Sequence, residues 1–146
     1  MNLARFLVAV SLLFPARPQD RAEVVRAVLA VSEDLDGSLT GSRAGDAALL
    51  LVWSFAESDW RACVAGDGGR SLGAFQLQML DEKRACDVPT AAAEWLRRAR
   101  RSEGVCAVLP PDERLAGLAS GACDRGRELA RRRVTEARAL AGALAW

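Results

Sequence analysis

Histidine and tyrosine are both absent from this 146-residue chain. Without histidine, the chain cannot assemble a Ser-His-Asp triad, a Cys-His dyad or a histidine-bearing zinc site. Its cysteines include no CxxC pair, which disfavours a zinc or redox motif. We therefore expect no metal and no cofactor. Aromatic residues make up only 5% of the sequence, so alanine, leucine and valine must fill most of the core.

The remaining composition predicts a single domain of the all-α class, because the dominant apolar residues mostly favour helix and no segment has the pattern of a strand. The run Leu49–Trp53 is apolar on every side, which is typical of a buried central helix. We expect this helix over about 47–58, with Asp46 as its N-cap. The other expected helices cover about 20–31 (capped by Asp20), 90–101 (capped by Thr90), a helix started by Pro110-Pro111-Asp112 that contains 113–120, and an arginine-rich segment to about 144. Residues 73–80 are expected to be helical or extended.

The spacing of the four cysteines favours two disulfides. Cys63, Cys86, Cys106 and Cys123 are separated by 23, 20 and 17 residues, which is typical of a disulfide framework with three alternative pairings. We favour Cys63–Cys86 with Cys106–Cys123, because each pair closes one compact loop. The alternative is four reduced cysteines in a cytosolic protein.

Residues 1–19 have the outline of a minimal signal peptide or membrane anchor. A basic start precedes the nine-residue apolar run Phe6–Phe14, which is too short to span a bilayer. The small-residue cleavage pattern around Pro15 is poor, so a plain first helix or a membrane-surface anchor stays open. Together with the cysteines, this segment favours an exported protein, periplasmic or extracellular, that meets a membrane only through residues 1–19. The folded domain is expected over 20–146.

The net charge of +1 conceals a basic C-terminal part. Residues 97–146 contain eleven arginines and six acidic residues, including the run Arg131–Arg133. We interpret these arginines as solvated helix faces, with an anionic polymer as the alternative partner. No aromatic residues are interleaved with them and no known motif is present, so no nucleic-acid partner is expected. The sequence does not indicate an oligomeric state.

Glu57 is the strongest candidate for a catalytic group. It lies at the end of the apolar run, where loss of hydration would keep a carboxyl protonated near neutral pH, as a general acid requires. A glycine-rich turn and a second apolar segment, Gly73-Ala74-Phe75-Gln76-Leu77-Gln78, follow it. The alternative is an ordinary surface glutamate at a helix end.

Glu57-Ser58 followed by GDGGRSLGAFQLQ (66–78) resembles the lysozyme-like superfamily, above all the soluble lytic transglycosylases of SLT type. Their pattern is a helix ending in Glu-Ser, a glycine-rich turn and a G-x-x-Q segment; here Gln76 lies nineteen residues after Glu57. The resemblance covers about 44–133. It implies a lysozyme-like helical fold and cleavage of the β-1,4 bond between N-acetylmuramic acid and N-acetylglucosamine in a peptidoglycan glycan strand. Glu57 would act as the acid and then as the base.

The substrate-binding residues implied by this resemblance are Ser58, Trp60, Ser71, Gly73, Phe75, Gln76 and, on a later helix, Ser120. Structural roles compete with several of them. Gln76 could bond the backbone instead of a sugar, and Trp60 could pack in the core instead of lining the glycan cleft. Ser71, Gly73 and Phe75 have turn and packing roles as their alternative. Trp53 is expected in the core.

The sequence departs from the family patterns in two ways. A glycosidase with two carboxylates would need a partner for Glu57, and Asp59 and Asp67 are the candidates. Chicken-type lysozymes carry their second aspartate where this chain has Ser71, which favours the one-carboxylate transglycosylase. The family's later tyrosine-bearing motif corresponds to residues 118–121, which contain no tyrosine. The alternative function is therefore a non-catalytic peptidoglycan-binding module with a degenerate site.

Overall fold

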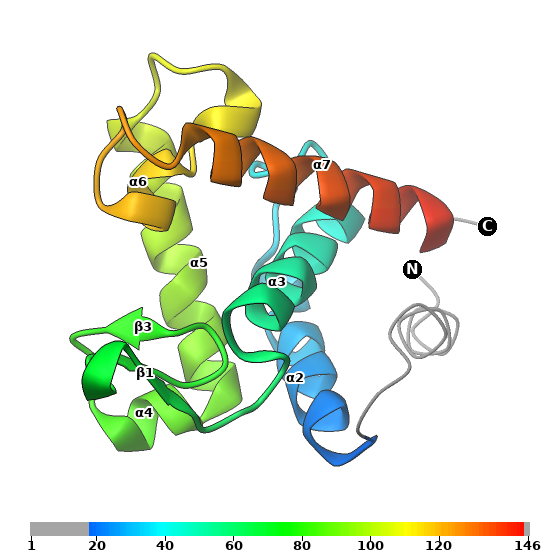
Figure 1. The fold of residues 1–146 in the computed structure, drawn as a ribbon. Helices are drawn as coiled ribbons and strands as arrows, with labels where there is room; N and C mark the ends of the chain where they lie inside the picture. Colours follow the sequence, from blue (N-terminus) through cyan, green and yellow to red (C-terminus); the bar gives the residue numbers. More distant parts are fainter. Residues whose placement is uncertain (1–17, 145–146) are drawn as a thin grey trace.

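The structure is a computed structural model that describes residues 18–144. The expected signal or anchor segment, 1–19, lies outside the described residues except for its last two positions. The described part forms a mostly helical domain with a small antiparallel sheet (Figure 1). The α-helices are α2 (Pro18–Ala30), α3 (Arg43–Ser58), α4 (Glu82–Cys86), α5 (Val88–Val105), α6 (Ala116–Ser120) and α7 (Arg127–Leu144). The strands are β1 (Ala65–Gly66), β2 (Ser71–Leu72) and β3 (Leu77–Gln78), and the short 3-10 helices are η1 (Ser32–Asp34), η2 (Asp67–Gly69) and η3 (Pro111–Glu113).

Helix α3 is the buried centre of the domain, as its sequence predicts. Leu49, Leu50 and Leu51 have no exposed surface, and Trp53 is 4% exposed. Helices α2 and α7 both pack against α3, and α5 packs against α2 (Figure 1). A helix enclosed in this way holds its last turn in a fixed place, and that turn contains Glu57.

The start of α3 differs from the sequence prediction. The helix begins at Arg43, because Ser42 caps it by accepting a hydrogen bond from the Gly45 N–H at 3.0 Å. Asp46 is not the cap. Its buried carboxylate accepts hydrogen bonds from the Thr40 N–H at 2.9 Å and the Thr40 hydroxyl at 2.8 Å, and so holds the preceding loop against the helix.

Other helix boundaries shift for similar reasons. Helix α5 is capped by Asp87, whose carboxylate accepts a hydrogen bond from the Thr90 N–H at 3.1 Å, so Thr90 lies in the first turn and is not the cap. Helix α2 begins at Pro18, ahead of the expected cap Asp20. The single helix expected to start at Pro110-Pro111-Asp112 and to contain 113–120 is divided into η3 and α6, whereas α7 ends at Leu144 as predicted.

The prediction that no strand is present is wrong in one region. Strand β1 pairs with β2 (Ala65 opposite Leu72), and β2 pairs with β3 (Leu72 opposite Leu77), both antiparallel. Each strand has only two residues, which is too short for the alternation of polar and apolar residues that marks a strand. Part of the segment 73–80 is therefore extended, as one of its two predicted states.

The predicted disulfide pairing is confirmed. Cys63–Cys86 joins the segment before β1 to the end of α4, and Cys106–Cys123 joins the end of α5 to the loop after α6. Two disulfides favour an oxidising, exported location. Among the described residues, no helix combines the length and apolar character needed to cross a bilayer.

Candidate functional site

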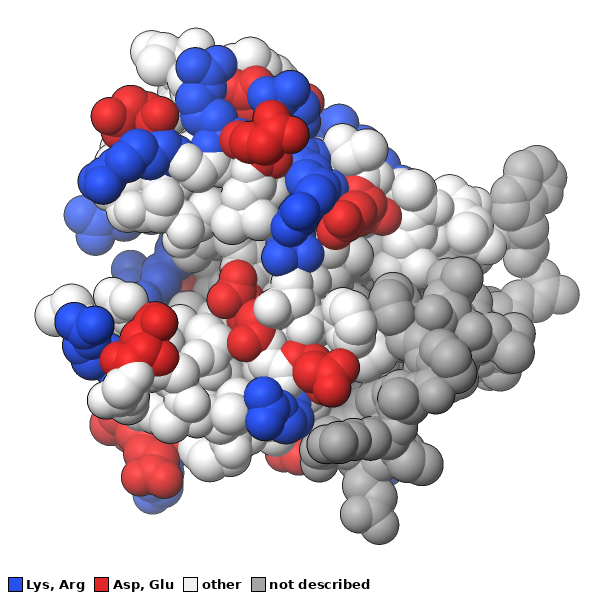
Figure 2. Space-filling model, viewed as in Figure 1, with Lys and Arg blue, Asp and Glu red and all other residues white. Residues whose placement is uncertain are grey.

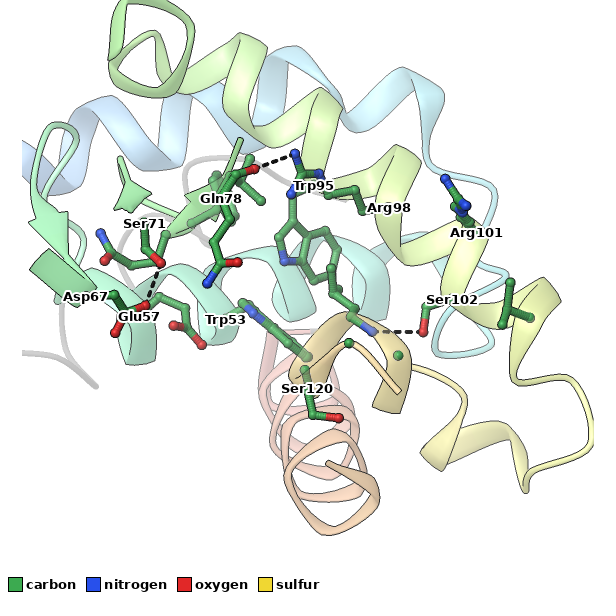
Figure 3. A pocket seen from close by; sticks show the side chains of 18 residues that line it. Trp53, Glu57, Asp67, Ser71, Gln78, Trp95, Arg98, Arg101, Ser102 and Ser120 are labelled. Atoms are coloured by element: carbon green, nitrogen blue, oxygen red, sulfur yellow. Dashed lines mark hydrogen bonds between the residues drawn. The ribbon is translucent and has the colours of Figure 1, made fainter. Parts of the chain in front are cut away.

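A cleft of about 820 Å³ lies between the small sheet and the helices α3, α5 and α6. Figure 2 shows it as a hollow on the face where the sheet and α6 approach each other, and Figure 3 shows it from close by. Its lining includes Trp53 and Glu57 from α3; Trp95, Arg98, Arg101, Ser102 and Val105 from α5; Leu118, Ala119 and Ser120 from α6; and Asp67, Ser71, Phe75, Gln76 and Gln78 from the sheet region.

The last turn of α3 presents Glu57 to this cleft. The side chain is half-buried and projects into the cavity (Figure 3). Ser58 directly behind it is 2% exposed and donates a hydrogen bond to the Ser54 carbonyl at 2.9 Å. The helix then ends because Asp59 adopts a left-handed conformation, and its N–H bonds the Phe55 carbonyl at 2.7 Å. The carboxyl is therefore held at the end of a rigid, buried helix.

The surroundings of Glu57 favour its protonated form. Burial is the largest influence, and it raises the pKa of Glu57 above the ordinary value for a glutamate. The positive charge of Arg133 on α7 lowers this pKa, and the negative charge of Asp67 raises it, without reversing the effect of burial. A carboxyl whose pKa is raised in a cleft can donate a proton at a pH where an exposed glutamate is fully ionised.

Asp67 is the second carboxylate of the cleft, and Figure 3 shows it on the same side as Glu57. It lies in η2, between β1 and β2, and accepts a hydrogen bond from the Ser71 hydroxyl at 2.6 Å. The other candidate partner, Asp59, is exposed and does not line the cleft. The structure thus separates the two candidates in favour of Asp67.

Gln76 lines the cleft, but its amide nitrogen bonds the backbone. It donates hydrogen bonds to the Val64 carbonyl at 3.1 Å and the Gly73 carbonyl at 2.9 Å. Its Oε1 lies so close to Gly66 that a Cβ added there would come within 2.2 Å of it. Gln76 therefore holds the sheet region together by bonding the backbone, which is the expected alternative to sugar binding.

Five of the predicted site residues line the cleft together: Glu57, Ser71, Phe75, Gln76 and Ser120. Ser58, Trp60 and Gly73 do not line it. Trp60 is 1% exposed, and its indole N–H donates a hydrogen bond to the Leu51 carbonyl at 2.9 Å. Gly73 has a φ of +77° and forms the turn after β2. These three residues therefore have structural roles outside the cleft lining.

Sequence reasoning missed the wall that α5 contributes. Trp95 is fully buried beneath the cleft, and its ring meets that of Trp53 edge to face, with centroids 5.3 Å apart. Its indole N–H has no hydrogen-bond partner among the described residues. Arg98, Arg101 and Val105 continue the same wall. From Trp95 onward, these residues follow one another at intervals of three, three and four, which places them on one helix face, and this was the signal available in the sequence.

Metal binding has little support in the described part of the chain. The grouping with suitable spacing there is Cys63, Glu82 and Cys86, whose potential ligand atoms lie within 4.8 Å of one another. The two sulfurs are joined in a disulfide, and the thiolate is the form of cysteine that binds metals.

Comparison of the chain with protein-family models, with curated proteins and with solved structures finds no match.

Proposed function

We propose that this protein cleaves the β-1,4 glycosidic bond between N-acetylmuramic acid and N-acetylglucosamine in peptidoglycan, as a lytic transglycosylase with Glu57 as its acid and base. One observation carries the proposal: Glu57, with a raised pKa, ends a buried helix and projects into a cleft of about 820 Å³. The resemblance of 57–78 to the SLT-type transglycosylases supplies the substrate class.

A single carboxyl group is sufficient for this reaction. Protonated Glu57 gives its proton to the bridging oxygen as the bond from that oxygen to the sugar C1 breaks. The resulting carboxylate accepts the proton of the sugar's own C6 hydroxyl, whose oxygen bonds to C1. The products are a free hydroxyl end and a 1,6-anhydro sugar, and Glu57 is protonated again.

Asp67 gives the cleft a second carboxylate, so hydrolysis is the closest variant of this reaction. In hydrolysis a carboxylate activates water or attacks C1, and the product has an ordinary reducing end. The hydrogen bond from the Ser71 hydroxyl holds the Asp67 side chain in place. The chemical form of the new sugar end therefore distinguishes the two reactions.

A non-catalytic peptidoglycan-binding module is the second candidate. No tyrosine occurs in the chain, and the α6 side of the cleft offers Leu118, Ala119 and Ser120. The Ser120 hydroxyl bonds the carbonyls of Ala116 and Ala122, both at 3.0 Å. The α6 side thus provides no aromatic hydroxyl to orient the acid or the sugar.

The test uses purified protein and Glu57→Gln with isolated peptidoglycan sacculi, and mass spectrometry of the released fragments. We expect fragments with 1,6-anhydro ends, and release that is about 10²- to 10⁴-fold slower from Glu57→Gln. Glu103→Gln is a matched control, because the pKa of Glu103 is also raised by burial but its side chain lies outside the cleft lining. Its activity should stay at the wild-type level.

Each other outcome has a definite meaning. Reducing ends in place of anhydro ends would assign hydrolysis, with Asp67 as the second carboxylate. Binding to sacculi without release of fragments would assign the binding module. Equal release from the wild type and Glu57→Gln would remove Glu57 from the chemistry and overturn the proposal.

A further inference from the structure

The two sides of the cleft carry opposite charges. Glu57 and Asp67 lie at the side formed by the end of α3 and the sheet region, whereas Arg98 and Arg101 lie at the α5 side (Figure 3). An anionic group entering the cleft is repelled by the negative charge of Asp67 at the first side and attracted by the two guanidinium groups at the second. A ligand with one negative charge can therefore bind in only one orientation without an electrostatic penalty.

Arg98 is held in place but keeps its positive charge towards the cleft. Its Nε donates to the Glu94 carboxylate at 2.8 Å, and its Nη2 donates to the Gln78 carbonyl at 2.9 Å. Glu94 also binds Arg97 at 2.7 Å, so one carboxylate serves two guanidinium groups. The other N–H groups of Arg98 stay available, since a guanidinium has five.

Arg101 lies almost one helical turn further along α5 and is exposed. Within residues 18–144 its side chain makes no ion pair and no hydrogen bond, although it lines the cleft. By contrast, Arg100 on the same helix bonds the Asp34 carbonyl and lies 3.9 Å from the Asp36 carboxylate. Arg101 is thus a cleft cation with its full hydrogen-bonding capacity unused.

Beyond Arg101, the α5 side offers few further groups for hydrogen bonding to a ligand. The Ser102 hydroxyl donates to the Arg114 carbonyl at 2.7 Å and accepts from the Leu118 N–H at 3.1 Å. Val105, which is 69% exposed, gives the next turn of the wall an apolar surface. An anionic group on a short apolar stem would match this sequence of two cations and a valine.

We propose that Arg98 and Arg101 form an anion subsite that holds the carboxylate of a substituent on the glycan strand while Glu57 faces the bond to be cleaved. This inference rests on the proposed function and assigns the two side chains that bind the acidic group of its substrate. The favoured ligand is a glycan whose sugars carry acidic side groups, such as the lactyl ether of muramic acid or a peptide attached to it. A neutral strand of N-acetylglucosamine alone lacks the group that the subsite binds.

The experiment measures binding by calorimetry on Glu57→Gln, so that no ligand is cleaved. The probes are a muramic-acid-containing tetrasaccharide with free lactyl carboxylates and the neutral tetramer of N-acetylglucosamine. Adding Arg101→Gln should lower affinity for the acidic probe about tenfold, as expected for a hydrogen bond to a charged group, and leave the neutral probe unchanged. Higher salt should lower the affinity for the acidic probe more in Glu57→Gln alone than in the variant that also carries Arg101→Gln.

Arg125→Gln is the control, because Arg125 is exposed and lies outside the cleft lining. It should change neither affinity. Equal affinity of both probes, unaffected by Arg101→Gln, would overturn the anion subsite and leave the proposed cleavage intact. A selective loss of the acidic probe in a protein that releases no fragments from sacculi would support the subsite and reject the enzyme. Absence of binding by either probe would overturn both.

Discussion

The two sides of the cleft are built in different ways. The helical side, from α3 and α5, consists of long helices with apolar faces buried in the core. The sheet side, over 62–80, has two-residue strands joined by tight turns. Of the five non-glycine residues with positive φ in the described part of the chain, Asp67, Gln76 and Met79 lie in this region, and the other two directly follow α3. The helical side therefore holds its shape by burial, and the sheet side by backbone conformations that few residues adopt.

This difference bears on how the proposed enzyme would work. Glu57 must keep its position to within a fraction of an ångström, and it lies on the side that is rigid by packing. The sheet side carries Asp67 and Ser71, and it depends on glycines and on the Cys63–Cys86 disulfide. Damage to the sheet region should therefore change the shape of the cleft while leaving the acid in place.

The largest expected effect on stability comes from Gly73→Ala in the sheet region. A Cβ at position 73 would lie 2.0 Å from the Ala85 carbonyl oxygen, on a backbone with a φ of +77°. Overpacking against backbone and an unfavourable φ together should lower the free energy of unfolding by roughly 2–5 kcal/mol. Denaturant unfolding followed by tryptophan fluorescence measures this loss.

Gly69→Ala is the matched control for Gly73→Ala. Gly69 also has a positive φ, of +89°, but a Cβ there would meet nothing within 4 Å. Only the conformational cost applies, so we expect a loss of about 1 kcal/mol. Equal losses from the two substitutions would show that contact with α4 does not hold the sheet region in place.

Removing the disulfides one at a time compares the two regions directly. Cys63→Ser with Cys86→Ser, and Cys106→Ser with Cys123→Ser, open loops of similar length, with separations of 23 and 17 residues. Each double variant should lose about 3 kcal/mol of stability. Hydrogen exchange should accelerate over 63–80 in the first variant and over 106–123 in the second. Faster hydrogen exchange in both segments of both variants would show that the sheet region does not loosen independently of the segment 106–123.

The sequence allowed the helical side to be predicted and hid the sheet side. The run Leu49–Trp53 predicted a buried helix because every face of it is apolar, and it placed Glu57 at the helix end. The caps were misplaced because Asp46 and Thr90 also suit a cap, and local sequence does not show that Ser42 and Asp87 lie nearer the true ends. Which of two suitable residues caps a helix depends on tertiary contacts.

Site residues that belong to one sequence motif could be predicted, whereas those that reach the cleft through the packing of distant segments could not. Glu57 and Gln76 were found from one motif. The contribution of Arg98 and Arg101 depends on how α5 is rotated against the sheet, which their spacing alone does not fix. Trp60 follows Glu57 closely in sequence, yet its indole turns under the helix to reach the Leu51 carbonyl. Closeness in sequence to a catalytic residue therefore does not place a side chain in the cleft.

The smallest expected effect is on the pH dependence of activity, because two nearby charges shift the pKa of Glu57 in opposite directions. The positive charge of Arg133 on α7 lowers the pKa of Glu57, whereas the negative charge of Asp67 raises it. A general acid works below its own pKa, so the upper pH limit of kcat/KM follows the pKa of Glu57. Arg133→Gln should move that limit to higher pH, and Asp67→Asn should move it to lower pH.

The raised pKa of Glu57 also makes the free energy of unfolding depend on pH. Because folding raises the pKa of Glu57, the folded state binds its proton more tightly than the unfolded state. The free energy of unfolding therefore falls as the pH rises from the unfolded to the folded pKa of Glu57. Above both pKa values, the wild type has lost all of the stability that ionisation of Glu57 removes. Glu57→Gln removes this dependence, so it should lose activity without losing stability at neutral pH. A shift of the activity limit in the same direction for Arg133→Gln and Asp67→Asn would mean that these two charges act through the shape of the cleft instead of through the proton on Glu57.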